Sequence, residues 1–351
     1  GCGYYQFTQN NGRRWSTASA YLTPARSRTN LTIITHAITQ RVLFDGTQAT
    51  GVEISRRGRK QTIQGAHVIL SGGAVASPQL LEVSGVGDGE RLRTLGIDVV
   101  HHAPDVGEHL QDHILCKVVY ATQPEHSINR EVQGLRLIPA ALRWFFLREG
   151  PLTTGSAPVG AFCHTRDGLE APDVQIHFAS GGTLYNNAGK IRALKQPAVT
   201  AVVNQSRPES RGSIHAKSSD IADAPVIAAN YLSSALDRDT LLRGMRILLN
   251  IFDQSELQPY LNGRLSPDIE TDLNDDEALM AYIRREASTV YHPTSTCCIG
   301  KVVDENLRVM GVEGLSVIDA SVMPYVVSGN TNAATIMLAE KGADHLLAAR
   351  R

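Results

Sequence analysis

Short apolar runs separated by turn residues divide the first part of the chain into predicted strands. The runs Leu31–Thr35 and Val42–Phe44 are predicted to be strands, and a turn at Asp45-Gly46 follows the second. Apolar and polar residues alternate over Gly51–Ser55, as in a half-buried strand. The basic stretch Arg56–Lys60 comes next, and its charge favours a solvated hairpin tip.

The following apolar strand is predicted to lead through a glycine turn into a helix. His67–Ser71 precedes Gly72-Gly73, and Ser77–Ser84 has a helical pattern with Pro78 in its first turn. This arrangement can bring backbone N–H groups to a phosphate or to a ring edge. Tight packing explains paired glycines equally well, so the turn alone does not predict a ligand site.

Beyond Cys116 the pattern mixes strands and helices without a βαβ repeat. Period-two alternation marks the strands, and an apolar stripe with helical spacing marks the helices. The predicted elements are strands at Asp173–Phe178, Val199–Val203 and Arg211–His215, and helices at Leu241–Phe252 and Asp275–Arg285. Such a mixture is typical of an α+β domain.

One apolar segment, Val132–Leu147, leaves three interpretations open: a core helix, a subunit-contact helix or a membrane-surface helix. Its cations are Arg136, Arg143 and Arg148, which is few for a membrane-binding face. The pattern therefore favours the core or a contact in a homo-oligomer over peripheral membrane contact.

Composition places the 351-residue chain among globular proteins of one large or two modest domains. With 42% hydrophobic and 20% charged residues the chain can bury a sizeable core. The net charge of −1 gives no field that would attract nucleic acid, so we expect no nucleic-acid partner.

Five scattered cysteines favour reduced thiols and a cytoplasmic setting, with membrane association left open. Cys297 and Cys298 are adjacent, which suits neither a simple disulfide nor a metal clamp, so we expect no metal site. No apolar run reaches membrane-spanning length, and no signal peptide is visible.

Candidate chemistry lies near the C-terminus. His292 precedes Pro293, which disfavours helical backbone, so the imidazole is expected on a turn, where it can accept a proton from a hydroxyl. The alternative is a histidine packed in a loop.

An apolar strand ends at Asp319, where the carboxylate either approaches a ligand or caps the turn. The run Ser328–Asn332 precedes a helix, and Asn330 or Asn332 could cap it.

Taken in order, these stretches resemble the signature motifs of glucose-methanol-choline (GMC) oxidoreductases, most of all the choline-dehydrogenase-like and alcohol dehydrogenase branch. The resemblance spans nearly the whole chain. The matching segments are Gly12–Ala18, Gly73–Leu81 with Ser84–Gly87, Val106–His113, Tyr291–Pro293, Val317–Pro324 and Ser328–Asn332.

The resemblance implies FAD as cofactor and assigns roles to single residues. His292 matches the family's catalytic base, and Asn330 matches the residue that hydrogen-bonds the substrate oxygen. Five further residues match positions that contact FAD: Ile38 near the adenine, Asp319 and Ala320 near the ribityl-pyrophosphate region, and Thr331 and Asn332 beside the isoalloxazine.

Two positions depart from the family pattern, and one element is missing. Ser295 stands where a glycine is usual, so positive φ is less accessible there, and Cys298 replaces an arginine and removes a cation. The family's strand followed by Gly-x-Gly-x-x-Gly, which holds the FAD pyrophosphate, does not occur in this chain. We therefore expect an N-terminally truncated chain that is inactive by itself.

The expected fold is α/β plus α+β: the C-terminal part of a Rossmann-like FAD-binding domain, with an inserted substrate-binding domain of antiparallel sheet and helices. The predicted division is 1–115 and 288–351 for the FAD-binding domain and 116–287 for the substrate-binding domain.

The leading functional hypothesis is FAD-dependent oxidation of an alcohol CH–OH group to an aldehyde, with oxygen or a quinone-like carrier as electron acceptor. One alternative is a non-catalytic remnant that cannot hold FAD, motivated by the altered run Thr294–Cys298. Another is a flavin-dependent lyase, which the motifs favour less.

Overall fold

The computed structural model describes residues 1–155, 157–185 and 191–349. The chain divides into two compact units. Unit 1 comprises Gly1–Ile33, Ile114–Ser206 and Arg238–Ser288, and unit 2 comprises Ile34–His113, Arg207–Asp237 and Thr289–Arg351.

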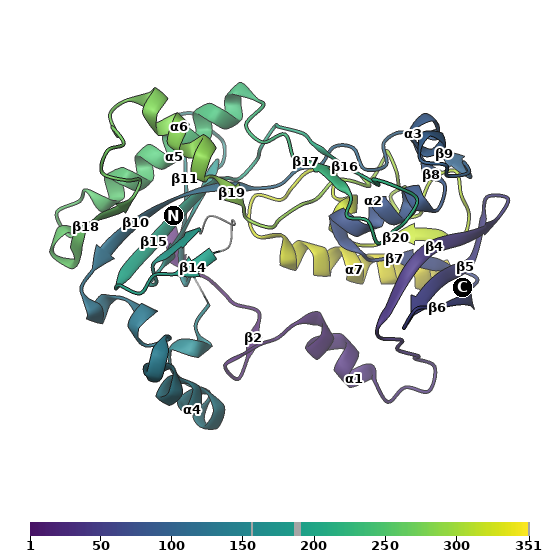
Figure 1. The fold of residues 1–351 in the computed structure, drawn as a ribbon, viewed down its shortest axis with the longest axis horizontal. Coiled ribbons are helices and arrows are strands. Elements are labelled where there is room, and N and C mark those ends of the chain that lie inside the picture. The colour runs from purple at the N-terminus through teal and green to yellow at the C-terminus, as the bar shows by residue number, and fades with distance from the viewer. Residues whose placement is uncertain (156, 186–190, 350–351) are drawn as a thin grey trace. The chain divides into compact units, whose positions relative to one another are not determined.

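Unit 1 is built on an antiparallel sheet. Its strands follow the order β1 (Cys2–Tyr4), β11 (Val159–Cys163), β12 (Val174–Ala179), β15 (Ala198–Gln205), β10 (Ile114–Thr122) and β18 (Leu261–Ser266) (Figure 1). The remaining elements assigned mainly to this unit are β2 (Gln9–Asn10), β3 (Arg13–Arg14), β13 (Thr183–Tyr185), β14 (Ile191–Ala193), β19 (Ser288–Thr289), α1 (Thr23–Ala25), α4 (Leu137–Leu147), α5 (Ala235–Phe252) and α6 (Asp276–Glu286).

Helix α5 covers the apolar face of this sheet. The Phe252 ring stacks on Tyr120 at a centroid distance of 4.5 Å and lies 6.4 Å from Phe178. Gly244 lets the helix approach closely, since a Cβ there would lie 2.9 Å from Val203 and 3.2 Å from Val174. The core of unit 1 therefore lies between the central strands and α5.

Unit 2 combines a meander with a parallel strand pair. Strands β4 (Ala37–Asp45), β5 (Gln48–Arg56) and β6 (Arg59–Gln64) form the meander, and β7 (Val68–Leu70) pairs in parallel with β20 (Leu315–Val317) (Figure 1). The other elements are β8 (Val86–Gly87), β9 (His101–His102), β16 (Ser213–His215), β17 (Val226–Ala228), α2 (Gly73–Val83), α3 (Gly89–Thr94) and α7 (Thr331–Ala348). A cluster that includes Val42, Leu70, Leu81 and Val317 forms its apolar core.

Several predicted elements are confirmed and two need correction. The turns at Asp45-Gly46 and within Arg56–Lys60 join β4, β5 and β6 as predicted. The prediction of a strand at Leu31–Thr35 was wrong, because this segment has no strand partner, and β-propensity without a ladder does not make a strand.

Helix α2 begins at Gly73, four residues earlier than predicted, so Pro78 lies inside the helix instead of in its first turn. A proline lacks the N–H that would bond the carbonyl four residues earlier, here that of Ala74. The Thr296 hydroxyl donates to the Ala74 carbonyl at 2.7 Å and satisfies it. A distant side chain thus makes an internal proline compatible with the helix.

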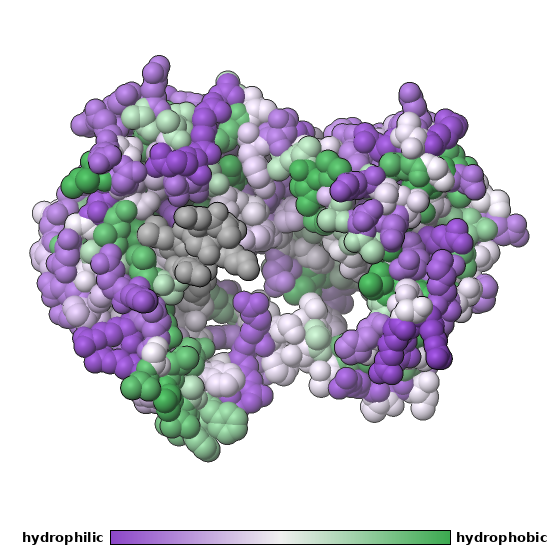
Figure 2. Space-filling model, in the orientation of Figure 1, coloured by the Kyte–Doolittle hydropathy of each residue, from purple (hydrophilic) through white to green (hydrophobic). Residues whose placement is uncertain are grey.

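Helix α4 is confirmed over Leu137–Leu147, but the core interpretation is wrong for the described chain. Ala140 is its one buried residue, and Phe146 and Leu147 are 72% and 63% exposed. Figure 2 shows apolar side chains gathered at this helix, at the lower left of the molecule. None of the described helices is long and apolar enough to cross a membrane.

The two units differ from the predicted division in two places. Residues 1–33 group with the central sheet because β1 pairs with β11. Residues 207–237 group with unit 2, where the β16–β17 hairpin contacts α2. Contacts between segments that are distant in sequence account for both assignments, a strand pair in the first case and a strand–helix contact in the second.

Candidate active site

A short loop in unit 2 carries His292 and is fastened to the segment Leu110–His113. Gln111 and Thr294 exchange two backbone hydrogen bonds, at 3.2 and 2.9 Å, and the Val290 amide donates to the His113 carbonyl at 2.9 Å. Tyr291 takes a positive φ of 63°, which turns the chain immediately before the histidine. The loop is thus held on both sides of His292.

The Asp112 carboxylate is the central acceptor of this loop. One oxygen accepts the His292 backbone N–H at 2.9 Å, and the other accepts the hydroxyls of Thr289 and Tyr231, the latter at 2.5 Å. Burial, with a further contribution from the neighbouring carboxylate, raises the pKa of Tyr231, so its phenol remains a donor. Asp112 therefore fixes the backbone of His292.

The His292 ring lies between His113 and Asn330. Its Nδ1 is 3.0 Å from Nδ1 of His113, and the two rings meet edge to face at 81°. Its Nε2 is 3.3 Å from Nδ2 of Asn330. His113 is fully buried and His292 is 9% exposed. With the amide nitrogen as donor to Nε2, the proton of a neutral His292 is on Nδ1 and the lone pair is on Nε2.

Asn330 occupies the N-cap position of α7 but makes no capping hydrogen bond with its side chain. The capping interpretation of Asn330 is therefore wrong, because the amide contacts the His292 ring instead. Thr331 at the first helical position is buried, and Asn332 is exposed. The first turn of an 18-residue helix carries partial positive charge, which favours an electron-rich partner nearby.

Asp319 acts as a cap in the structure. Its carboxylate accepts the Gly73 amide at 2.9 Å, the Ser77 hydroxyl at 2.6 Å and the Ser321 amide at 2.8 Å. The Ser77 hydroxyl oxygen also accepts the Gly72 amide at 3.0 Å. The amides of the Gly72-Gly73 turn are thus bonded within the chain, which supports the tight-packing explanation of this turn over the phosphate-binding one.

Ala320 begins the single turn that follows Asp319, Ala320–Val322, and is half-buried. Its carbonyl accepts the Ser295 amide at 3.4 Å, and the Ser321 carbonyl accepts the Cys297 amide at 2.8 Å. The Asp319-Ala320 turn and the His292 loop are therefore neighbours through backbone contacts.

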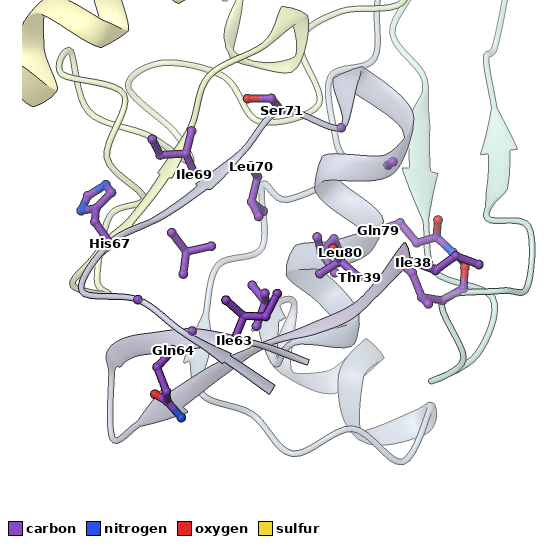
Figure 3. A pocket seen from close by; sticks show the side chains of 17 residues that line it. Ile38, Thr39, Ile63, Gln64, His67, Ile69, Leu70, Ser71, Gln79 and Leu80 are labelled. Atoms are coloured by element: carbon purple, nitrogen blue, oxygen red, sulfur yellow. The ribbon is translucent and has the colours of Figure 1, made fainter. Parts of the chain in front are cut away.

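Ile38 on β4 is 56% exposed and lines a cavity of about 680 Å³. Figure 3 shows Ile38 and Thr39 beside Gln79 and Leu80 of α2. Ser71 and Gly72, at the carboxyl end of β7, also line this cavity. None of the other six predicted site residues lines it, so Ile38 is apart from the His292 group.

The two departures from the family pattern are linked to each other. Ser295 adopts a φ of +75°, which a glycine would take without strain, and its carbonyl accepts the Cys298 thiol at 2.8 Å. Burial raises the pKa of Cys298, so the thiol stays protonated. All five cysteines are free thiols, and the described residues contain no metal-binding group of His, Cys, Asp or Glu.

Asp112 and His113 were visible in the sequence only as part of a matching run. The signal that could have singled them out is the pairing of a carboxylate and an imidazole in consecutive positions, both polar and both buried. Buried polar groups need partners, and both find them in the His292 loop.

The chain is similar to known proteins along most of its length. Models described as GMC oxidoreductase match residues 1–115 and 208–339. Choline dehydrogenase, mitochondrial, of Mus musculus is 39% identical over 98% of this chain and 58% of its own length. An oxygen-dependent choline dehydrogenase of Yersinia pseudotuberculosis is 41% identical over 95% of this chain and 59% of its own length. The chain thus spans about three fifths of the curated relatives it matches.

Solved structures agree with this assignment. Pyridoxine 4-oxidase from Mesorbium loti superposes with a TM-score of 0.84 at 26% identity, covering 98% of this chain and 64% of the other. Formate oxidase, at 22% identity, shares the fold with a TM-score of 0.89 over 97% of this chain and 64% of its own. The expected mixed α/β fold is confirmed, and the chain belongs to the GMC oxidoreductase family.

Proposed function

We propose that this chain supplies the catalytic residues of an FAD-dependent oxidoreductase that oxidises an alcohol to an aldehyde. The observation that carries the proposal is the placement of His292 Nε2 beside the Asn330 amide, in the loop fastened by Asp112. A lone pair on an imidazole and an amide donor side by side suit a hydroxyl that must lose its proton and keep its oxygen in place.

In the proposed reaction His292 Nε2 accepts the hydroxyl proton and Asn330 donates a hydrogen bond to the alcohol oxygen. An asparagine does not titrate, so the proton can go only to the histidine of this pair. The neutral Nδ1–H of His292 remains directed at His113 while the ring gains its second proton. FAD, when bound, supplies the group that takes the hydride from the carbon.

The residues present fit a flavin at two places. The first turn of α7, with Thr331 and Asn332, is not capped by the Asn330 side chain and would favour an electron-rich ring edge. The cavity at Ile38 offers apolar walls for a planar heterocycle such as adenine. Asp319 and Ala320 would contribute the shape of their turn, because the Asp319 carboxylate already accepts hydrogen bonds within the chain.

The proposed donor is a small alcohol, with choline as the first candidate because two curated relatives are choline dehydrogenases. Oxygen is the proposed acceptor, since one of these relatives is described as oxygen-dependent. The domain roles also remain proposals: unit 2 as part of the FAD-binding domain and unit 1 as the substrate-binding domain. A cytoplasmic setting, a homo-oligomer and membrane contact stay predictions.

The test is His292→Ala in the complete protein with flavin bound. We expect flavin content to be retained and the rate of anaerobic flavin reduction by choline, or by the best of a series of primary alcohols, to fall by about 10²–10⁴-fold. His164→Ala is the matched control, because His164 is exposed and lies in unit 1. An unchanged reduction rate in His292→Ala would reject His292 as the base, and a complete protein without flavin would support the non-catalytic alternative.

A further inference from the structure

We propose that His113 is a positioning residue that fixes the tautomer of His292, so that Nδ1 carries the proton and Nε2 is the base. This inference rests on the proposed alcohol oxidation and goes beyond it by assigning a role to a second imidazole.

The contact between the two rings allows only complementary protonation. Two Nδ1 atoms 3.0 Å apart share one proton: one nitrogen donates and the other accepts. Two protons would place N–H against N–H, and none would place lone pair against lone pair. The protonation of His113 and that of His292 are therefore coupled at this atom pair.

Burial makes this coupling strict. His113 is fully buried, so water cannot replace either ring at the contact. The ring of His292 is itself only 9% exposed. Exchange to the other tautomer would have to move both protons together, and the Asn330 amide would have to reverse as well, because its Nδ2 is 3.3 Å from Nε2.

The backbone keeps this contact aligned. The Val290 amide donates to the His113 carbonyl, and the Asp112 carboxylate accepts the His292 amide. With the contact between the two rings, the consecutive residues Asp112 and His113 bind the loop through three hydrogen bonds. Two titratable groups of this unit, Asp112 and Tyr231, lie beside the pair. Asp112 is occupied by the His292 backbone amide and by two hydroxyls. The contact at His292 Nδ1 is made by Nδ1 of His113, at 3.0 Å.

The chemical consequence concerns the charge that forms during catalysis. When Nε2 takes the alcohol proton, the imidazolium keeps donating from Nδ1 to the lone pair of a neutral His113. A neutral acceptor orients the base and stabilises the new cation without placing a fixed negative charge behind it. In many enzymes a carboxylate fills this place, and here a second imidazole does.

Two matched variants of the complete, flavin-loaded protein separate positioning from packing. Asparagine at position 113 places an amide oxygen near the position of Nδ1 and keeps an acceptor, whereas leucine keeps volume and removes it. We expect His113→Leu to lower the limiting rate of anaerobic flavin reduction about 10–100-fold, the usual effect of losing a partner that orients a histidine. His113→Asn should keep a rate well above that of His113→Leu, because the acceptor remains. Equal losses in the two variants would overturn the proposal.

A second measurement does not depend on turnover or on the two His113 variants. In protein labelled with ¹⁵N-histidine, the His292 signals, assigned by their loss in His292→Ala, should show a protonated Nδ1 and an unprotonated Nε2. A protonated Nε2 in the unsubstituted protein would overturn the tautomer assignment even if both variants misfold. Failure of the proposed function looks different, because no alcohol would then reduce the flavin while the tautomer remains as expected.

Discussion

Around α5, unit 1 buries aromatic and aliphatic side chains against a sheet, whereas unit 2 buries carboxylates and imidazoles beside its apolar core. In unit 1, the ring of Phe252 on α5 stacks parallel to that of Tyr120 on β10, with an interplanar angle of 3°. In unit 2 the buried ring of His215 lies between Glu82, at 2.8 Å from Nδ1, and Glu108, at 3.0 Å from Nε2.

These two kinds of contact respond differently to substitution. Apolar packing depends mainly on volume and tolerates changes that conserve it. A buried carboxylate depends on each partner, because a lost hydrogen bond leaves a desolvated group behind. Glu82 is fully buried and also accepts the Ala216 amide at 2.5 Å, so α2 is tied to the segment after β16 by one side chain. Unit 2 also contains the His292 loop. A buried carboxylate with several partners positions this loop, as Glu82 positions α2.

The largest stability effect is expected from Phe252→Ala in unit 1. Removing a buried ring that stacks on Tyr120 leaves a cavity between α5 and the sheet, and the expected loss of unfolding free energy is about 3–5 kcal/mol. Hydrogen exchange of peptides from β10 and α5 measures it in the complete protein, and peptides of unit 2 should change little.

Phe146→Ala is the matched control, because this phenylalanine on α4 is 72% exposed. Its expected effect is within about 0.5 kcal/mol. A loss as large as that of Phe252→Ala would show that α4 is covered in the complete protein, and would make the subunit-contact interpretation of α4 the better one.

A smaller effect, confined to unit 2, is expected from Glu82→Gln. The amide has nearly the same shape but replaces one acceptor oxygen with a donor, so either His215 or the Ala216 amide loses its partner. The expected loss is about 1–3 kcal/mol. Exchange of the α2 amides should accelerate while β12 and β15 keep their protection. Glu90→Gln, on the exposed face of α3, serves as control. If strands of unit 1 lost protection equally, the contrast between the units would not hold.

Elements with strong local signals were predictable from the sequence. The predicted helix Asp275–Arg285 is observed at Asp276–Glu286, with Asp275 as its N-cap, and the predicted helix Leu241–Phe252 lies within α5, which begins at Ala235. The strand predicted at Leu31–Thr35 failed because strand formation requires a partner that the local pattern does not specify. The partner that satisfies the Ala74 carbonyl in α2 is Thr296, more than two hundred residues away, and the local pattern does not specify it.

The candidate site was predictable in its members but not in its contacts. Motif order identified His292 and Asn330, which the fold brings to 3.3 Å across 38 positions of sequence. The local pattern offered Asn330 or Asn332 as a cap, because a cap uses neighbouring amides, whereas the observed partner of Asn330 is distant in sequence. The role inferred for His113 could not be predicted, since it depends on the rotation of two rings that only tertiary packing fixes.

The smallest expected effect has the opposite sign and concerns Ser295, whose φ of +75° strains any residue with a Cβ. Ser295→Gly should relieve about 1–2 kcal/mol of strain in the folded state, while the greater freedom of glycine when unfolded offsets about 0.4–1 kcal/mol. The net expectation is stabilisation of about 0–1.6 kcal/mol, measured as a raised midpoint of thermal unfolding. Ser255→Gly, an exposed position without positive φ, should lower the midpoint instead. If both variants lowered the midpoint, the hydrogen bond between the Ser295 and Thr294 hydroxyls, at 3.0 Å, would outweigh the backbone strain. The stability of this turn of unit 2 would then depend on a polar contact, as that of Glu82 does.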